Sequence, residues 1–224
     1  KIPSYGATGW WDKSAYKEGM VLGDIWGLQF DRFLTEDDFN ADGSLKAGLP
    51  DQTKVFPAGY QFAPGDVLYK DLDNNGEIVK QTNRNDKGDL SVIGNALPRL
   101  QFGLNLDAAW KGFDISMFFQ GVAKRKLWAA GNQVLPGFTT GEPFYKGAED
   151  YWTPENTDAF YPRPMDYKQS ASGNYSVNDR YLLNMAYLRL KTFTVGYSLP
   201  KVWLSKFKVQ GLRVYFTGEN LFTI

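Results

Sequence analysis

Apolar and polar residues alternate along the segment 100–119. Even positions are apolar from Leu100 to Trp110, while polar residues such as Gln101 and Asn105 lie between them. The alternation resumes after a short break at 111–112 and runs to Phe119. Alternation places the two kinds of residue on opposite faces of a strand, and so short a break favours a tight turn. The segment is therefore predicted to form a β-hairpin with one apolar and one polar face.

Three further segments are predicted to be strands. Residues 187–199 and 212–222 are rich in β-branched and aromatic residues interspersed with polar ones, and residues 20–33 carry Trp26, Leu28 and Phe30 in phase. A short turn or helical turn is expected at 200–206. Two long stretches rich in Gly, Pro, Asn and Asp, at about 34–70 and 122–186, are expected to be loops.

This arrangement fits two all-β architectures. A tilted strand of about 9–11 residues crosses a bilayer, and short turns that alternate with long loops are typical of outer-membrane barrels. A transmembrane antiparallel β-barrel is therefore expected. The alternative is a soluble, secreted β-sandwich that acts as a carbohydrate-binding module with a structural calcium loop. A sandwich buries its apolar strand face, whereas a barrel exposes that face to lipid.

Composition excludes several function classes. The 224 residues contain 25 basic and 25 acidic side chains, so there is no basic excess to neutralise nucleic-acid phosphates. Without Cys or His, the chain has no disulfide, no Cys/His zinc site and no Ser-His or Cys-His catalytic pair. We therefore expect no nucleic-acid-binding protein. A glycosidase would need only two acids that face each other across a sugar, but the adjacent acids Asp37-Asp38 and Glu149-Asp150 would point in different directions. We therefore do not expect an enzyme.

Hydropathy and the chain ends add two expectations. The mean hydropathy is −0.41, and the sequence has no apolar run of about 18 residues, which excludes a transmembrane helix. The chain begins at Lys1 without an initiator Met or an apolar leader, and it stops at Ile224 inside an expected strand. We therefore expect a segment of a longer protein.

Many ordered motifs carry a resemblance to a known family. They lie at 64–76, 93–95 with Pro98, 102–105, 111–114, 118–121, 151–156, 179–180, 187–191, 196–200 and 218–222. Their order and spacing resemble the C-terminal part of the barrel of the SusC/RagA group of TonB-dependent outer-membrane transporters. Each motif is weak alone, but together they cover most of the chain from about Met20 onward.

The resemblance implies a fold, a location and partners. Residues 1–224 would form the C-terminal part of a plugged barrel of about 22 strands in the bacterial outer membrane, and the plug domain and TonB-binding segment would lie outside this chain. Family members import oligosaccharides or peptides with a SusD-like surface lipoprotein, driven by TonB. The implied partners are that lipoprotein, TonB, outer-membrane lipid and an oligosaccharide or peptide.

In such a barrel the two faces of the predicted hairpin have different surroundings. Lumen-facing candidates are Gln101, Asn105 and Asp114, and lipid-facing candidates are Leu104, Leu106, Ile115 and Phe119. A bulge would exchange the two sets, because a shift of one residue turns every side chain to the other face.

The segment 71–78 resembles the first half of a calcium-binding loop. Asp71, Asp73 and Asn75 would supply side-chain oxygens, Gly76 the sharp turn, and Glu77 a backbone carbonyl. The closing carboxylate of a contiguous loop is missing, because Thr82 stands at its position. Related loops of the resembled family carry an acid shortly before the Ile-Gly-Asn motif, a place that Asp89 holds. With an insertion looped out, Asp89 or Asp86 would complete the calcium site; the alternative is an Asx-rich turn without metal.

Aromatic residues in the expected loops are candidates for substrate contact. Trp128, Tyr145, Tyr151 and Trp152 would stack on sugar rings, whose C–H groups pack against π systems. The alternative is loop packing around nearby prolines.

Overall fold

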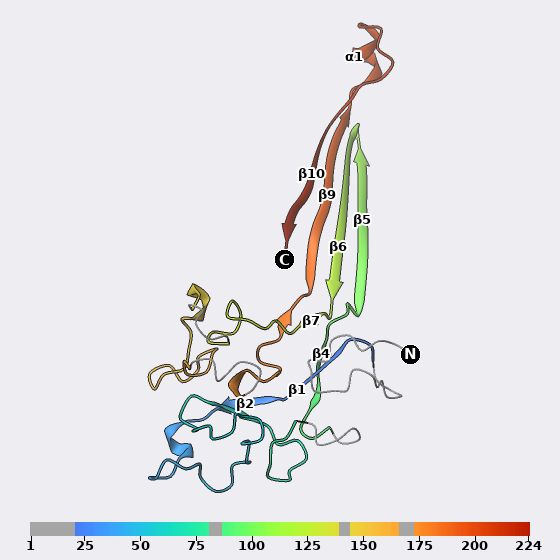
Figure 1. Ribbon diagram of the computed structural model, residues 1–224. Helices are drawn as coiled ribbons and strands as arrows, with labels where there is room; N and C mark the ends of the chain where they lie inside the picture. Colours follow the sequence, from blue (N-terminus) through green and yellow to red (C-terminus); the bar gives the residue numbers. More distant parts are fainter. Residues whose placement is uncertain (1–20, 81–86, 139–143, 166–172) are drawn as a thin grey trace. The chain divides into compact units, whose positions relative to one another are not determined.

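The computed structural model describes residues 21–80, 87–138, 144–165 and 173–224 (Figure 1). Within them the elements are β1 (Asp24–Gly27), β2 (Phe30–Phe33), β3 (Val67–Tyr69), β4 (Ser91–Asn95), β5 (Leu100–Trp110), β6 (Phe113–Ala123), β7 (Lys126–Leu127), β8 (Leu183–Asn184), β9 (Tyr187–Ser198), α1 (Lys201–Ser205) and β10 (Arg213–Thr223). Single 3₁₀ turns lie at Glu36–Asp38, Lys146–Ala148 and Gly173–Tyr175. No helix in these ranges is long and apolar enough to cross a membrane.

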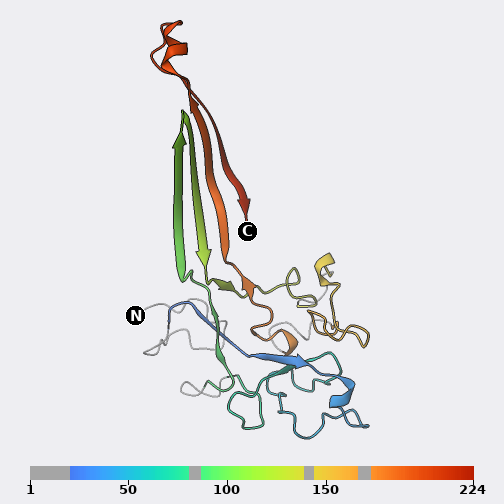
Figure 2. The same ribbon diagram turned by 180° about the vertical axis from the view of Figure 1, so that it is seen from behind.

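The chain divides into two compact units. The loop unit comprises Lys1–Leu97 and Lys126–Leu183, and the sheet unit comprises Pro98–Arg125 and Asn184–Ile224. The sheet unit holds the four long strands in the order β10-β9-β6-β5, with each neighbouring pair antiparallel. The turn between β5 and β6 and the segment that carries α1 lie at the same end of this sheet (Figures 1 and 2).

The strand register creates one continuous apolar face. Residues directly opposite each other in an antiparallel pair project to the same face. Leu104 lies opposite Phe119, and Ile115 lies between Ala108 and Val195. On the same face, Gly121 accommodates the Phe102 ring, because a Cβ at Gly121 would lie only 2.2 Å from the Phe102 Cζ atom. The glycine therefore gives an aromatic ring room to lie flat against the neighbouring strand.

The opposite face is largely polar. Ser116 lies opposite Asp107 and Thr194, and the hydroxyl oxygens of Thr194 and Thr217 are 2.9 Å apart. The register between β6 and β9 shifts between Phe118 and Phe119. This irregularity absorbs one residue of β9, and both faces keep their character on either side of it, so the two predicted sets of side chains are not exchanged.

The apolar face of the sheet is exposed. Leu104 is 49% exposed, Leu106 43% and Ile115 38%, and among its described residues the sheet unit holds no second sheet that could cover them. This is the opposite of the packing that a β-sandwich requires. The described strands also form no closed barrel, so the structure contains an open part of a β-sheet.

The long strands agree with the sequence pattern, and the first predicted strand does not. The strands expected at 100–119, 187–199 and 212–222 are β5, β6, β9 and β10, and α1 is the expected helical turn. The single strand expected at 20–33 is interrupted at 28–29, where the Leu28 N–H donates to the Val177 carbonyl at 2.9 Å. β1 then pairs with β4 and β2 with β3, and β3 lies inside the expected loop 34–70.

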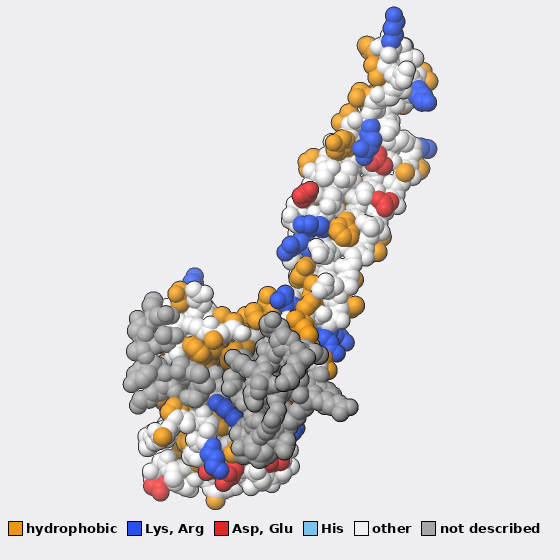
Figure 3. Space-filling view, turned by 45° about the vertical axis from the view of Figure 1, so that its right-hand side comes forward, with side chains coloured by type: hydrophobic (Ala, Val, Ile, Leu, Met, Phe, Trp, Pro, Cys, Tyr) orange, Lys and Arg blue, Asp and Glu red, His pale blue; other side chains and the backbone are white. Residues whose placement is uncertain are grey.

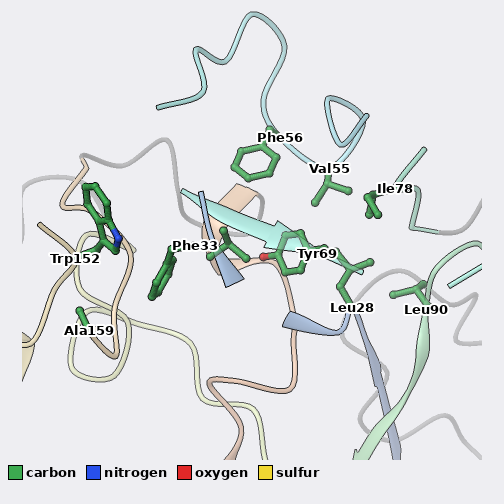
Figure 4. Close-up of a cluster of buried hydrophobic side chains, with 10 residues drawn as sticks. Leu28, Phe33, Val55, Phe56, Tyr69, Ile78, Leu90, Trp152 and Ala159 are labelled. Atoms are coloured by element: carbon green, nitrogen blue, oxygen red, sulfur yellow. The ribbon is translucent and has the colours of Figure 1, made fainter. Parts of the chain in front are cut away.

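A hydrophobic core organises the loop unit (Figure 4). Its fully buried members include Leu28, Val67, Tyr69 and Ile78, which come from segments far apart in the sequence. Burying one such side chain contributes about 1.5–3 kcal/mol. The two expected loops are therefore packed structures that can hold side chains in fixed positions.

Candidate functional site

The acidic loop begins directly after β3 and turns sharply. Asn74 and Gly76 adopt positive φ values of 57° and 86°, a conformation that Asn and Gly tolerate better than other residues. The Gly76 N–H donates to the Asp71 carboxylate at 2.7 Å, and the Asn75 N–H donates to the Asp73 carboxylate at 3.1 Å. These bonds hold both carboxylates on the inside of the turn.

Asp89 returns to this loop from a distant point of the chain. Its carboxylate is fully buried and accepts hydrogen bonds from the N–H groups of Leu72 at 2.8 Å and Val79 at 2.7 Å. The Asp89 N–H donates to the Val79 carbonyl at 2.9 Å, so these two residues lie side by side. Carboxylate oxygens of Asp71, Asp73 and Asp89 all lie within 4.8 Å of one another. Thr82 and Asp86 lie outside the described residues.

The three carboxylates make this loop a negatively charged centre. Desolvation, together with repulsion from Asp89 and Asp71, raises the pKa of Asp73. Desolvation also acts on Asp71, but hydrogen bonds from backbone N–H groups outweigh it and lower the pKa of that residue. A centre with several oxygen donors and crowded negative charge suits a hard cation such as Ca²⁺.

The other two proposed ligands are engaged within the protein. The Asn75 side-chain oxygen accepts a hydrogen bond from the Glu77 N–H at 2.8 Å. The Glu77 carboxylate forms an ion pair with Lys54. The Glu77 carboxylate is thus directed to Lys54, and the Glu77 backbone carbonyl stays the oxygen predicted for a metal.

An aromatic pocket of about 350 Å³ lies in the loop unit. Of the predicted aromatic candidates, Tyr145 and Tyr151 line it, and they are 47% and 41% exposed. Trp152 instead lies in the core at 6% exposure, and Trp128 packs against a second buried cluster. The two tryptophans therefore have packing roles, which was the alternative interpretation of the loop aromatics.

Several pocket residues escape the sequence analysis. Phe144, Tyr161 and Tyr175 also line the cavity, together with prolines at 136, 162 and 164. The prolines beside Tyr161 are a usable signal, because proline fixes the backbone and leaves neighbouring rings in place. Nothing in the local sequence indicates that Tyr175, which is 3% exposed, would reach the same cavity.

The three lumen candidates share the polar face of the sheet. Gln101 and Asn105 are an even number of residues apart on β5, and Asp114 on β6 pairs with Ala109, which lies on the same face as they do. Asp114 forms an ion pair with Arg213 across β9, at 2.5 Å. The pair passes over Gly196, where a Cβ would lie 2.5 Å from the Arg213 guanidinium. Glycine at this position thus leaves room for a charged bridge across the middle strand.

No protein-family model matches the chain, but individual proteins do. The chain is 29% identical to TonB-dependent receptor P3 of Formosa agariphila over 213 residues. The aligned region covers 92% of this chain and 18% of the relative. TonB-dependent receptor P26 of the same organism is 34% identical over 153 residues, 66% of this chain and 14% of the relative. TonB-dependent receptor SusC of Bacteroides thetaiotaomicron is 25% identical, over 84% of this chain and 19% of the relative. The chain spans about a fifth or less of the length of these relatives.

The fold agrees with the sequence matches. A solved structure of the RagAB peptide transporter aligns with 90% of this chain and 19% of its own chain, with a TM-score of 0.55 and 18% identity. The described part of the chain therefore has the fold of one part of that protein. TonB-dependent receptors are bacterial outer-membrane proteins and are not enzymes, which confirms the expected location and the expected class. Sequence and fold together show that this chain belongs to the SusC/RagA family of TonB-dependent receptors.

Proposed function

We propose that the chain is part of the barrel wall of a SusC-like importer. The observation that carries the proposal is the four-stranded sheet, with one apolar face and one polar face, in a chain that matches TonB-dependent receptors over most of its length. The apolar face meets lipid, and the polar face with Asp114 and Arg213 lines the path of the substrate. The substrate is an oligosaccharide or a peptide.

The finer arrangement follows from the same proposal. Residues 1–224 form the C-terminal part of a plugged barrel of about 22 strands. The end of the sheet with the 111–112 turn and α1 faces the periplasm, and the long loops at about 34–70 and 122–186 are extracellular. A SusD-like lipoprotein covers the mouth, and TonB acts through a plug outside this segment. The similarity to TonB-dependent receptor SusC and to the RagAB peptide transporter supports these partners.

We also propose that the aromatic pocket contacts the substrate. Tyr145 and Tyr151 present rings that are close to half exposed beside a cavity large enough for one sugar ring or one amino-acid side chain. Aromatic faces bind both kinds of group through apolar contact, and the hydroxyl groups remain free to form hydrogen bonds. The pocket thereby adds affinity for the substrate before translocation.

One uptake experiment tests both proposals. Uptake of labelled oligosaccharides and peptides is measured in cells that lack the full-length receptor, carry the intact gene, or carry Tyr145→Ala/Tyr151→Ala. We expect the intact gene to restore TonB-dependent uptake and the double variant to reduce it about tenfold, because each lost stacking contact costs about 0.5–1.5 kcal/mol. The matched control Tyr145→Phe/Tyr151→Phe keeps both rings and is expected to retain uptake.

The outcomes separate the two proposals. Equal uptake with and without the receptor gene contradicts the importer. Normal uptake by the double alanine variant contradicts only the pocket.

We propose in addition that the acidic loop binds Ca²⁺. Support comes from the carboxylates of Asp71, Asp73 and Asp89, which lie within 4.8 Å of one another. They offer the hard oxygen donors that calcium prefers, and the Glu77 carbonyl would add a fourth. Calcium would tie the loop after β3 to the segment before β4 and so stiffen the loop unit.

Calcium titration of the full-length receptor by calorimetry tests this site. We expect dissociation constants of about 10⁻⁴–10⁻³ M, as in extracellular calcium modules. Asp73→Asn should weaken binding by about tenfold, because it removes one of the three charges. Asp42→Asn changes an exposed carboxylate that bonds only locally to Ser44 and serves as the control. Unchanged affinity in Asp73→Asn would leave the Asx-rich turn as the better interpretation.

A further inference from the structure

The segment 199–212 between β9 and β10, here called the connector, has an unusual surface. β5 and β6 are joined by Lys111 and Gly112 alone, whereas the connector contains α1 and a following turn. The Leu199 N–H donates to the Leu212 carbonyl at 3.0 Å and closes the base of the connector. So short a link as 111–112 is enough to join two antiparallel strands, so the longer connector calls for another explanation.

The connector is ordered, yet its large apolar side chains point outward. Leu204 is buried at 5% exposure, and its carbonyl accepts hydrogen bonds from the N–H groups of Phe207 at 2.9 Å and Val209 at 3.2 Å. Val202 is nevertheless 75% exposed, Trp203 59% and Phe207 76%. One leucine is buried within the connector, and three apolar side chains are left exposed for another surface.

The charge of the connector has a single sign. Lys201, Lys206 and Lys208 are all exposed, and no acidic residue occurs between Pro200 and Arg213. Orange hydrophobic and blue basic side chains lie together at this end of the sheet in Figure 3. Apolar and basic side chains on one short segment are the combination that binds the interface of an anionic membrane.

The connector also continues the lipid-facing surface of the sheet. Trp110 and Phe113, the last residues of β5 and the first of β6, are 69% and 51% exposed and lie on the apolar face at the end next to the connector. Lys111 lies over the Trp110 ring at 4.7 Å. Aromatic rings at the level of the headgroups, with cations beside them, are typical of membrane boundaries.

We propose that the connector binds the periplasmic leaflet of the outer membrane, with Trp203 and Phe207 inserted at headgroup level and the three lysines on anionic phospholipid headgroups. The inference rests on the proposed function for the side of the membrane that this end of the sheet faces. The connector then fixes the depth of β9 and β10 in the bilayer. Charge complementarity and continuity with the apolar face argue for lipid as the partner.

Lipid contact is tested with the full-length receptor in lipid nanodiscs. Phosphatidylcholine discs, with or without phosphatidylglycerol, are prepared with brominated chains that quench tryptophan at short range. The difference in quenching between the native receptor and Trp203→Phe isolates the signal of Trp203. We expect Trp203 to be quenched. If Trp203 is not quenched in a receptor with normal uptake, the lipid contact is contradicted and the importer function is not. If the native receptor shows no uptake, only the proposed importer function is contradicted.

Headgroup preference is tested with a lysine variant. Native mass spectrometry measures how strongly phosphatidylglycerol is enriched around the receptor. We expect Lys201→Gln/Lys206→Gln/Lys208→Gln to lower the enrichment about tenfold, since each basic residue near an anionic surface contributes up to about fivefold. The corresponding arginine variant should restore it.

A matched control uses other exposed lysines of the chain. Lys46→Gln/Lys70→Gln/Lys87→Gln removes the same charge from exposed positions of the loop unit and should leave the enrichment unchanged. Equal enrichment in the native receptor and the connector variant would overturn the role of the lysines and point to a protein partner for this surface.

Discussion

Arginine in place of Leu104 is expected to destabilise the assembled receptor by about 2–4 kcal/mol. Leu104 lies near the middle of β5, on the exposed apolar face and opposite Phe119. In a membrane this position is close to the bilayer midplane, where a guanidinium group loses its hydration. Urea titration of the full-length receptor in lipid vesicles, followed by the heat-dependent shift on gels, measures the effect.

The next residue along β5 is the matched control. Asn105 projects to the polar face, so Asn105→Arg adds the same side chain at the same depth but in contact with water. We expect a change of at most about 1 kcal/mol there, since a lumen-facing charge remains hydrated. Equal destabilisation by both variants would show that the two faces do not differ in their surroundings and would contradict the assignment of lipid to the apolar face.

Alanine in place of Asp66 is expected to lower the free energy of unfolding of the loop unit by about 3–5 kcal/mol, the largest effect we expect for one residue. Asp66 is fully buried, and its carboxylate accepts hydrogen bonds from Arg163 Nε at 2.8 Å, the Tyr60 hydroxyl at 2.8 Å and Asn174 Nδ2 at 2.9 Å. Burial, together with the charge of Asp66, raises the pKa of Tyr60 well above its usual range, so Tyr60 remains a hydrogen-bond donor. Loss of the carboxylate removes the counter-charge of Arg163 and the acceptor of the other two donors.

Hydrogen exchange of the full-length receptor measures this loss by segment. We expect protection to fall around β3 and around Arg163, while β5 and β6 in the sheet unit keep theirs. Asp66→Asn is expected to lose less protection than Asp66→Ala, because the amide keeps the shape of the side chain and one acceptor oxygen. Asp42→Ala, at an exposed position, should change stability by no more than about 0.5 kcal/mol. Native-like protection in Asp66→Ala would show that the network does not hold the loop unit together.

Strand pairing explains which parts of the fold could be predicted from the sequence. In β5 and β6, residues two positions apart lie on the same face of the strand. The alternation at 100–119 is therefore sufficient to predict both strands and their two faces. The break at Leu28 has a different origin, since its N–H bonds to Val177, far away in the chain. A local pattern does not encode such a partner, and the apolar run at 20–33 was predicted as one strand.

The two candidate sites differ in the same way. Asp71, Asp73 and Asn75 are close in sequence, and Asp89 was identified only through the resemblance to a family. The structure brings Asp89 to the loop through hydrogen bonds with Leu72 and Val79. The aromatic pocket is harder to predict from the sequence, because residue type does not reveal whether a ring such as Trp152 is buried or exposed. Of the four predicted rings, two line the pocket.

The outer strands of the sheet have a consequence for biogenesis. β5 and β10 each have a neighbour on one side only among the described residues, and every second residue along their free edges points its N–H and C=O groups outward. In hydrocarbon each unsatisfied group costs several kcal/mol. Further strands must therefore pair with both edges before this sheet is stable in a bilayer, and in water an unpaired edge is a site for edge-to-edge aggregation.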